Sequence, residues 1–515
     1  MNEPTQTQRS IWRSPLPWLA LGFWLTYLFT ASGGLEVSDA VLRYQTARSW
    51  LEGQGGALPR ELGWGGGAVA PDGRVYSFYG PLQSVLMVPF LIVARALPVP
   101  GLPTDVVETF AISLGLFPLL SAGVIVLLYL ALGHLGVAPR LRLLTCLGIG
   151  LGSMFWHYAR MGQEESLVAF GFALWLLGAA RLIAGRRFPA LLMAAGAAVC
   201  LATRWSVGPQ LAVLALATLI LLWRFRERVS LRDLAAGVAL VAGVAFLVLL
   251  YNHVRFGDWL QTGYGLRYAH EGHSMFYFDD FGRHLAALLV SPYRGLLFYS
   301  PIVLAGVAGF FFLRTPGGRL LGLTALCVLA VALLVIAAFR FWAGGHSWGP
   351  RFLTAPQVLL APALAALFAR APRRAAWLVA LLACLQIFST MQPASTEEYV
   401  WDTLNRTDPG HCSEWRFECT AVPSRVPRAL EALANTVENE PGMAMSGRGI
   451  VPPEVVLSTS DYRTLYWWPV RIAFRLRRFP AWVALLVCAA GLAAAAGCLA
   501  RAWRRAATGE TSLAL

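Results

Sequence analysis

Acidic side chains that could act as a catalytic base stand at two points of the sequence, each beside a long apolar block. Asp39 follows the first block within GGLEVSDAVLRYQTARSWLEG, and Glu164 and Glu165 follow another within FWHYARMGQEESL. A carboxylate held at such a place can take a proton from an incoming hydroxyl group. Each point also has a plainer interpretation. Ser38 or Asp39 caps a helix over 40–52, and the two glutamates open the next helix and complement its dipole.

Arginine and aromatic residues gather in three further loops beside apolar blocks: YNHVRFGDWLQTGYG (251–265), SPYRGLLFYSP (291–301) and FRFWAGGHSWGPRFL (339–353). Guanidinium groups suit phosphate oxygens, and glycine permits close approach of the backbone, so the three loops together predict a phosphate site. Alternatively, an arginine at the end of a span simply extends its side chain towards the lipid head groups. The residues that we expect to bind substrate are Tyr76, Tyr79, Arg160, Arg255, Arg294, His346, Trp348 and Arg351.

The basic residues exclude several other chemistries. All 42 of them are arginine, and a chain without lysine can form neither a Schiff base nor the phosphate loop of a Walker-type ATPase. The net charge of +14 could suggest nucleic acid, but the arginines lie in short loops between apolar blocks, where they orient a chain in a membrane. Histidines and aspartates between Tyr268 and His284 could bind a divalent metal, although their spacing matches no specific site. The sequence requires no cofactor.

The composition is that of an all-α polytopic membrane protein. Of the 515 residues, 57% are hydrophobic and only 14% are charged, and the apolar residues come in blocks long enough to cross a bilayer. The spans contain almost no acids, although proton-coupled transporters need ionisable groups near the membrane midplane. We expect about 12 spans, near residues 16–33, 107–132, 143–158, 167–184, 189–203, 206–223, 234–252, 296–313, 320–338, 353–369, 375–391 and 480–500.

The short, proline-interrupted segment Pro81–Leu97 decides the topology. If it lies on the membrane rather than across it, the cytoplasmic segments hold 19 arginines and four acids, and the outer segments hold 23 arginines and 24 acids. The positive-inside rule favours this arrangement, which places both termini in the cytoplasm and the candidate site outside. The pair 189–203 and 206–223 forms either two full spans or a re-entrant hairpin. Arg471 and its neighbouring arginines, outside and before the last span, suggest an interfacial stretch.

The chain divides into three parts. Residues 1–391 form a transmembrane module with outer loops over 34–106 and 253–295, residues 392–479 a small extracytoplasmic region, and residues 480–515 the last span with a cytoplasmic tail.

Two cysteines, Cys412 and Cys419, lie outside the apolar blocks. In an oxidising outer compartment, we expect them to form a disulfide.

Side by side, these loops resemble the GT-C superfamily of membrane glycosyltransferases, especially protein O-mannosyltransferases of family 39 and lipid A aminoarabinose transferases. The resemblance covers most of residues 16–370. It rests on Asp39, on RVYSFYGPLQSVLMVPF (74–90), on RMGQEES, on the first two arginine-bearing loops and on HSWGPRF (346–352). No single string is diagnostic; the order and spacing of all of them carry the likeness.

The resemblance implies an interfacial-helix-bearing GT-C fold in a bacterial inner membrane and an enzyme that takes sugar from a polyprenyl-phosphate carrier. The acceptor is a hydroxyl of a protein, lipid or glycan, and the reaction inverts the anomeric centre. Asp39 takes the role of the base in such an enzyme. Ser38 stands where relatives often have a second acid, and Glu164–Glu165–Ser166 departs from the Ser-Glu-Pro of bacterial relatives, which leaves the role of that pair open. A lipid or polysaccharide transporter and a non-catalytic assembly subunit are the alternatives.

Overall fold

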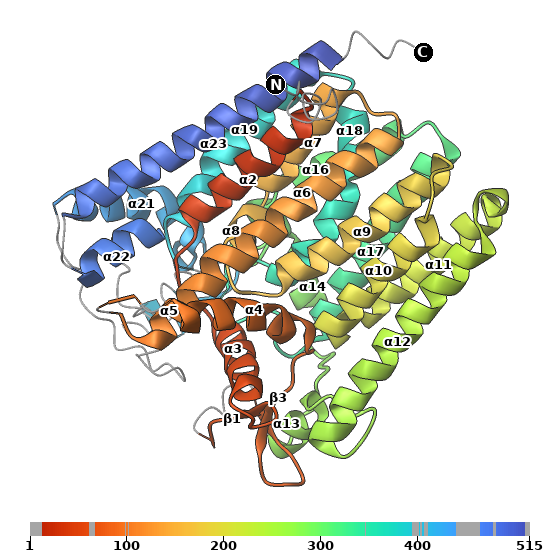
Figure 1. Ribbon diagram of the computed structural model, residues 1–515. Coiled ribbons are helices and arrows are strands. Elements are labelled where there is room, and N and C mark those ends of the chain that lie inside the picture. Colours follow the sequence, from red (N-terminus) through yellow and green to blue (C-terminus); the bar gives the residue numbers. More distant parts are fainter. Residues whose placement is uncertain are drawn as a thin grey trace, which may run out of the picture.

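The computed structural model describes residues 13–60, 67–97, 99–100, 102–345, 347–393, 401, 404–405, 410–438, 464–476 and 480–509. These residues form a bundle of long helices that run side by side, with shorter helices and one small sheet at one end (Figure 1). Among them, seven helices are long and apolar enough to cross a membrane, and four further apolar helices are shorter. The all-α membrane fold is as expected.

Every predicted span falls on helix. The elements are α2 (Pro15–Thr30), α5, η2 and α6 (Thr104–Ala111, Ile112–Leu116 and Phe117–His134), α7 and α8 (Pro139–Leu151 and Phe155–Ala159), α9 (Glu165–Ile183), α10 (Pro189–Thr203), η3 and α11 (Trp205–Val207 and Gly208–Arg224), α12 (Leu231–Phe256), α15, α16 and η5 (Leu296–Tyr299, Ile302–Gly309 and Phe310–Phe312), α17 (Pro316–Ala338), η6, η7 and α18 (Arg351–Leu353, Ala355–Leu360 and Ala361–Phe368), α19 (Pro372–Thr390) and α23 (Ala481–Gly509). Several of these helices open with proline, whose missing N–H costs nothing in the first turn.

The helices α10 and α11 both run the length of the bundle. The end of α10 is fixed beside α9 by the ion pair of Arg204 with Glu165, whereas at its start the backbone N–H groups of Ala190 and Leu191 donate to Asp233 at 2.9 and 3.1 Å. Asp233 lies in the first turn of α12, at the opposite end of the bundle from Glu165. These contacts at opposite ends of the bundle favour two crossing helices over a re-entrant hairpin, although α10 is one of the shorter apolar helices.

The helix α4 (Leu82–Ala96) does not cross the bundle. Near its start, the Gln83 amide donates to the carbonyl of Gly162, 2.6 Å away, in the turn before α9. Near its end, Arg95 forms an ion pair of 2.5 Å with the buried Glu108 of α5. Both partners belong to the same end of the bundle, where α4 lies with α3 (Ser38–Leu51) and α5 (Figure 1). This geometry supports the topology in which Pro81–Leu97 lies at the membrane surface.

A small sheet and two helices complete this end of the bundle. The strands β1 (Ala57–Leu58), β3 (Val75–Ser77) and β2 (Gly67–Val69) pair antiparallel in that order. Beyond α12 follow α13 (Tyr264–His270) and α14 (Phe281–Val290), and the backbone at Phe276 pairs with that at Phe339. The two predicted outer loops thus fold against the same end.

The C-terminal part packs on the outside of the bundle. It comprises η8 (Phe417–Cys419), α21 (Ala421–Val437), α22 (Trp468–Leu476) and α23, which lies against α2. Arg471 does not face lipid head groups as expected. It is buried, and its Nη1 donates to the carbonyl of Ser32 at 2.8 Å, because the side of α22 that carries Arg471 packs inwards.

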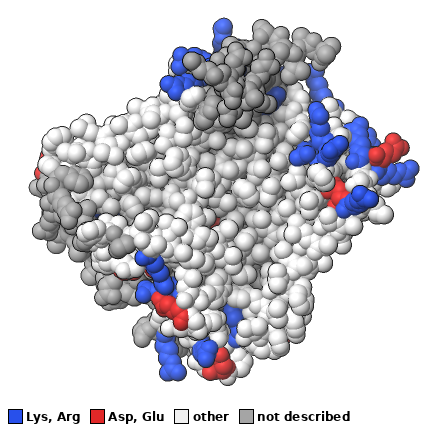
Figure 2. All heavy atoms as spheres, in the orientation of Figure 1, with Lys and Arg blue, Asp and Glu red and all other residues white. Residues whose placement is uncertain are grey.

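The surface has the charge distribution of a membrane protein. Figure 2 shows a broad face without charged side chains and arginines and acids gathered towards its ends. An uncharged belt of this kind fits the hydrocarbon core, where an unpaired charge is costly.

Candidate active site

Asp39 and Arg351, which are 312 residues apart in the sequence, form an ion pair. An Arg351 Nη2 atom lies 2.9 Å from an Asp39 carboxylate oxygen, and both side chains are only slightly exposed, at 13% and 12%. Asp39 lies in the first turn of α3, where the helix dipole favours an acid. Arg351 opens η6, after the glycine-rich loop that follows α17. The structure therefore joins the predicted base to one arm of the predicted phosphate site.

Neither Ser38 nor Asp39 caps the helix, contrary to the plainer interpretation of the sequence. The helix begins at Ser38, Val37 occupies the N-cap position, and no side chain makes a capping hydrogen bond there. The Ser38 hydroxyl instead donates to Asp39 at 3.4 Å. The Asp39 carboxylate is thus free of a capping role and is directed to Arg351.

The environment keeps Asp39 ionised. Burial acts to raise the pKa of its carboxyl, but the positive charges of Arg351 and then Arg43, with help from the Tyr79 hydroxyl, outweigh it and lower the pKa to about 2. At neutral pH the group is a carboxylate, which can accept a proton but has none to donate.

A second ionic network lies beside this pair. Glu164 contacts two guanidinium groups, those of Arg43 from α3 and Arg204 from the turn between α10 and α11. Arg204 also pairs with Glu165 at 2.8 Å, and an Arg43 nitrogen donates to the backbone carbonyl of Asp39 at 3.2 Å. All four of the network's side chains are buried. Since both glutamates face Arg204, they hold the end of α10 against the start of α9, and Glu164 opens α9 without a side-chain cap.

A cavity of about 440 Å³ opens at the Asp39–Arg351 pair. Its charged lining residues are Asp39, Glu164, Arg204, Arg267 and Arg351. Apolar side chains near the ends of the long helices also line it, among them Val168, Phe172, Val207, Val335, Ile336 and Pro356. The cavity thus combines ionic groups with apolar side chains at this end of the bundle. A larger hollow of about 530 Å³ lies at the loops around Asp72 and Arg74, away from this pair.

Aromatic residues form a wall of the cavity. The rings of Phe78 and Tyr264 lie 4.2 Å apart, and Tyr79 lies against Phe78 at 4.5 Å, with the Arg43 guanidinium 3.8 Å from its ring centre. Burial, followed by the charge of Asp39, raises the pKa of Tyr264 to about 12 and raises that of Tyr79 well above its ordinary value. Both hydroxyls therefore stay protonated at neutral pH and can donate hydrogen bonds.

Five of the predicted substrate-binding residues do not line this cavity: Tyr76, Arg160, Arg255, Arg294 and Trp348. Tyr76 lies in β3 with its ring edge on Phe256, and its hydroxyl donates to Asp72 at 3.1 Å. Arg255 binds the carbonyls of Ser77 and Tyr251 and so ties β3 to α12. In these positions the side chains hold the small sheet against the bundle.

Arg160 also lies outside the cavity. It is buried, with one nitrogen 3.2 Å from Glu36 and another donating to the carbonyl of Gln392 at 3.1 Å. It connects the loops after α2 and α19.

Arg294 and Trp348 hold in place the loop that carries Arg351. Arg294 donates to the carbonyls of Gly345 and Gly349, at 3.0 and 3.2 Å. Trp348 is fully buried, and its carbonyl accepts from the Tyr158 hydroxyl at 2.6 Å. The guanidinium of Arg294 is thus committed to backbone oxygens because the loop turns its carbonyls towards it. His346 lies outside the described residues.

Sequence reasoning missed four residues at the cavity: Arg43, Arg204, Tyr264 and Arg267. Arg43 stands four residues after Asp39, on the same face of its helix, which was a usable signal. Arg204 is the one charged residue between two apolar segments at the end of the bundle that also carries the glutamates. Tyr264 lies within the arginine-bearing loop over 251–265, although not as a predicted site residue, and nothing local marks Arg267.

The described residues contain no group of three or more histidines, cysteines, aspartates or glutamates that could hold a metal ion. His284, from the stretch considered for a metal, stacks on Trp342, and its Nδ1 lies 3.1 Å from the carbonyl of Ala337.

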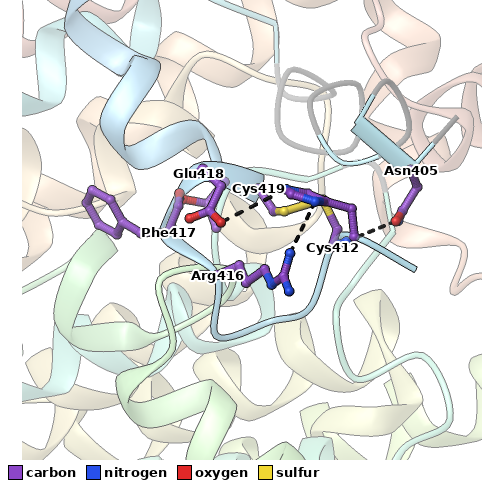
Figure 3. Close-up of a disulfide and its surroundings, with 8 residues drawn as sticks. Asn405, Cys412, Arg416, Phe417, Glu418 and Cys419 are labelled. Atoms are coloured by element: carbon purple, nitrogen blue, oxygen red, sulfur yellow. Dashed lines mark hydrogen bonds and ion pairs between the residues drawn. A yellow bond between two sulfur atoms is a disulfide. The ribbon is translucent and has the colours of Figure 1, made fainter. Parts of the chain in front are cut away.

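Cys412 and Cys419 form a disulfide, with Cα atoms 5.5 Å apart (Figure 3). It closes the short loop from Cys412 to Cys419, and Asn405, which precedes this loop, accepts a hydrogen bond from the Cys412 backbone at 3.0 Å. Arg283 of α14 pairs with Glu414 at 2.8 Å and joins this loop to the bundle.

No protein-family model matches the chain, and no curated protein matches its sequence. Among solved structures, the chain is similar to ArnT from Cupriavidus metallidurans bound to undecaprenyl phosphate, with 13% identity, coverage of 99% of this chain and 80% of that one, and a TM-score of 0.49. It is also similar to the apo state of the same protein, with 12% identity, coverage of 95% and 76%, and a TM-score of 0.48. This is a likeness in the course of the chain, and we transfer no residue role from it.

Proposed function

We propose that this protein is a membrane glycosyltransferase that moves a sugar from a polyprenyl-phosphate carrier to an acceptor hydroxyl at the outer face of the membrane. The observation that carries the proposal is the cavity at the Asp39–Arg351 pair, whose lining combines ionic groups with apolar side chains from the ends of spans. A polyprenyl-phosphate sugar likewise combines an ionic, sugar-bearing head with an apolar tail. The resemblance of the loops to GT-C enzymes agrees with this assignment.

The charges of the cavity suit a phosphate leaving group. Three guanidinium groups, of Arg204, Arg267 and Arg351, line it together with the two carboxylates of Asp39 and Glu164. Each of these arginines already pairs with an acid, since Arg267 also binds Glu271 at 3.0 Å and Arg204 binds Glu165 at 2.8 Å, so an entering phosphodiester exchanges some of these partners for its own oxygens. Positive groups fixed in a partly dry site stabilise the charge that develops on a departing phosphate. In our proposal these arginines form the clamp, in place of Arg255 and Arg294.

Asp39 then acts as the base for the acceptor hydroxyl. The acceptor oxygen forms a bond to the anomeric carbon while the bond from that carbon to the phosphate oxygen breaks, and its electron pair leaves with the phosphate. Asp39 takes the hydroxyl proton. With a pKa of about 2 it is a weak base, so the proton transfers as the new bond forms and the hydroxyl becomes acidic. Attack from the face opposite the phosphate inverts the anomeric centre.

Mass spectrometry of lipid that co-purifies with the protein tests the proposal. We expect a polyprenyl phosphate or its glycosylated form, and the mass of the glycosylated form names the sugar. Purified protein should then release polyprenyl phosphate from a glycosylated carrier only when an acceptor is present. A protein that moves the intact donor across vesicles without cleaving it is a transporter, and that result contradicts the proposal.

A further inference from the structure

The helix α21, in the C-terminal region that the proposed function does not use, has one face packed on the bundle. Its buried residues are Arg425, Ala429, Ala432 and Thr436, spaced by four, three and four residues. This spacing follows one side of a helix. The side chains therefore fix how the rest of the helix is oriented.

A second face of α21 is apolar and exposed. Leu430 is 55% exposed, Leu433 36% and Val437 55%. The acids Glu431 and Glu438 are also exposed, on a third side. At 3.6 residues per turn, the exposed apolar side and the acidic side are each turned by about 120° from the buried side. The helix thus presents three different faces to the bundle, to an apolar neighbour and to water.

The position of α21 is fixed at the end of two spans. The Gln392 amide, just after α19, donates to the backbone carbonyl of Arg425 at 2.8 Å. At the other end of α21, the Leu465 backbone donates to the Thr436 hydroxyl at 2.9 Å, shortly before α22 and α23. In Figure 1, α21 accordingly lies where α23 begins. It therefore lies near the ends of α19 and α23.

Exposed apolar side chains continue on both sides of this helix. On α23, Trp482 is 50% exposed and Leu486 59%. On the disulfide loop, Trp415 and Phe417 are 47% and 45% exposed, and Figure 3 shows Phe417 pointing away from the disulfide. The helix α21 thus packs against a membrane-spanning helix that itself exposes apolar side chains.

We propose that α21 is an interfacial helix that rests its apolar face in the lipid bilayer, with the adjoining disulfide loop as a second contact. An interfacial helix needs an apolar side towards the acyl chains and a polar side towards water, and α21 has both while its third side holds it to the protein. The contact of α21 with α23, a helix long and apolar enough to cross a membrane, favours lipid over a partner protein. The predicted extracytoplasmic region is in this respect a membrane-surface element.

Spin labels measure the depth of each face directly. The protein is first made with Cys327→Ala and Cys384→Ala, which remove the two exposed free cysteines. Leu430→Cys and Val437→Cys then place a nitroxide on the apolar face, and Glu431→Cys provides the matched control one residue away. Each variant is reconstituted in phosphatidylcholine–phosphatidylglycerol vesicles, and collisions with oxygen and with a water-soluble nickel chelate are measured.

We expect the labels at Leu430 and Val437 to collide more with oxygen than with the chelate and the label at Glu431 to show the reverse. If the labels on the apolar face collide with the chelate as often as the label at Glu431 does, this face lies in water and the proposal fails. Low collision with both reagents at Leu430 indicates a covering protein surface, such as a second copy of the chain, and overturns the lipid as occupant. Neither outcome depends on whether the cavity transfers sugar.

Discussion

Replacing Asp39 by asparagine separates its proposed chemical role from its structural one. The variant keeps the size of the side chain and an oxygen that can accept from Arg351, but it removes the negative charge. Loss of a general base slows such reactions by about 10²–10⁴-fold. We therefore expect transfer by Asp39→Asn to fall by a factor in this range, while binding of polyprenyl phosphate survives.

The structure also indicates how much the Asp39→Asn substitution should lower the free energy of unfolding. The pKa of Asp39 falls from 3.8 to about 2, and a difference of that size corresponds to about 2 kcal/mol of interaction with its surroundings. Because the folded pKa is depressed, this contribution is present above the ordinary pKa and is lost as the pH falls towards 2. At neutral pH the variant should be destabilised by about this amount and remain folded. The transfer rate of the unchanged protein should show no titration of Asp39 between about pH 5 and 8.

The assay compares transfer, donor binding and thermal stability in detergent or nanodiscs. Asp105→Asn is the matched control, because Asp105 is also an acid in the first turn of an outer helix but does not line the cavity. We expect the control to transfer sugar at the normal rate. If Asp39→Asn transfers sugar as fast as the control, Asp39 only pairs with Arg351, and the catalytic assignment is wrong.

Three further results are expected. Arg351→Ala should weaken binding of polyprenyl phosphate by about 10- to 100-fold, because a charged hydrogen bond contributes about 1.5–3 kcal/mol. Arg351→Lys should restore only part of this affinity, and normal binding by both variants in a titration would place the phosphate elsewhere. Arg294→Ala should lower thermal stability by more than Arg351→Ala does, since it leaves buried carbonyls unpaired; unchanged melting would show that these bonds hold nothing in place. Cysteines introduced at Gln54 and Pro100 should react with an impermeant thiol reagent added outside intact cells, whereas a cysteine at Ala138 should not react. If the cysteines at Gln54 and Pro100 react from opposite sides, the segment between them crosses the membrane.

The local pattern of residues was enough for the membrane fold. Lipid makes a helix satisfy its own backbone hydrogen bonds, so an apolar block of sufficient length has few other conformations open to it. Each predicted span accordingly falls on helix. The short segment Pro81–Leu97 was placed by charge counting, and the contacts of Gln83 and Arg95 with one end of the bundle agree with that placement.

The partners of each arginine could not be read from the sequence. Arg255, Arg294 and Arg351 look alike there, as arginines in glycine- and aromatic-rich loops at the ends of spans. The fold turns Arg255 and Arg294 towards backbone carbonyls and only Arg351 towards Asp39. A guanidinium group binds either acceptor well, so the choice depends on which oxygen the packing brings within reach.

The sequence by itself thus determined that the chain is a helical membrane protein, where its apolar helices lie, and that Asp39 stands at the start of a helix beside the first of them. These properties follow from hydrophobicity and charge, which act over neighbouring residues. The tertiary structure alone decided that Asp39 meets Arg351 and that Arg204 meets Glu164 and Glu165. Ion pairs of this kind join segments far apart in the chain, and their geometry exists only once the helices have packed.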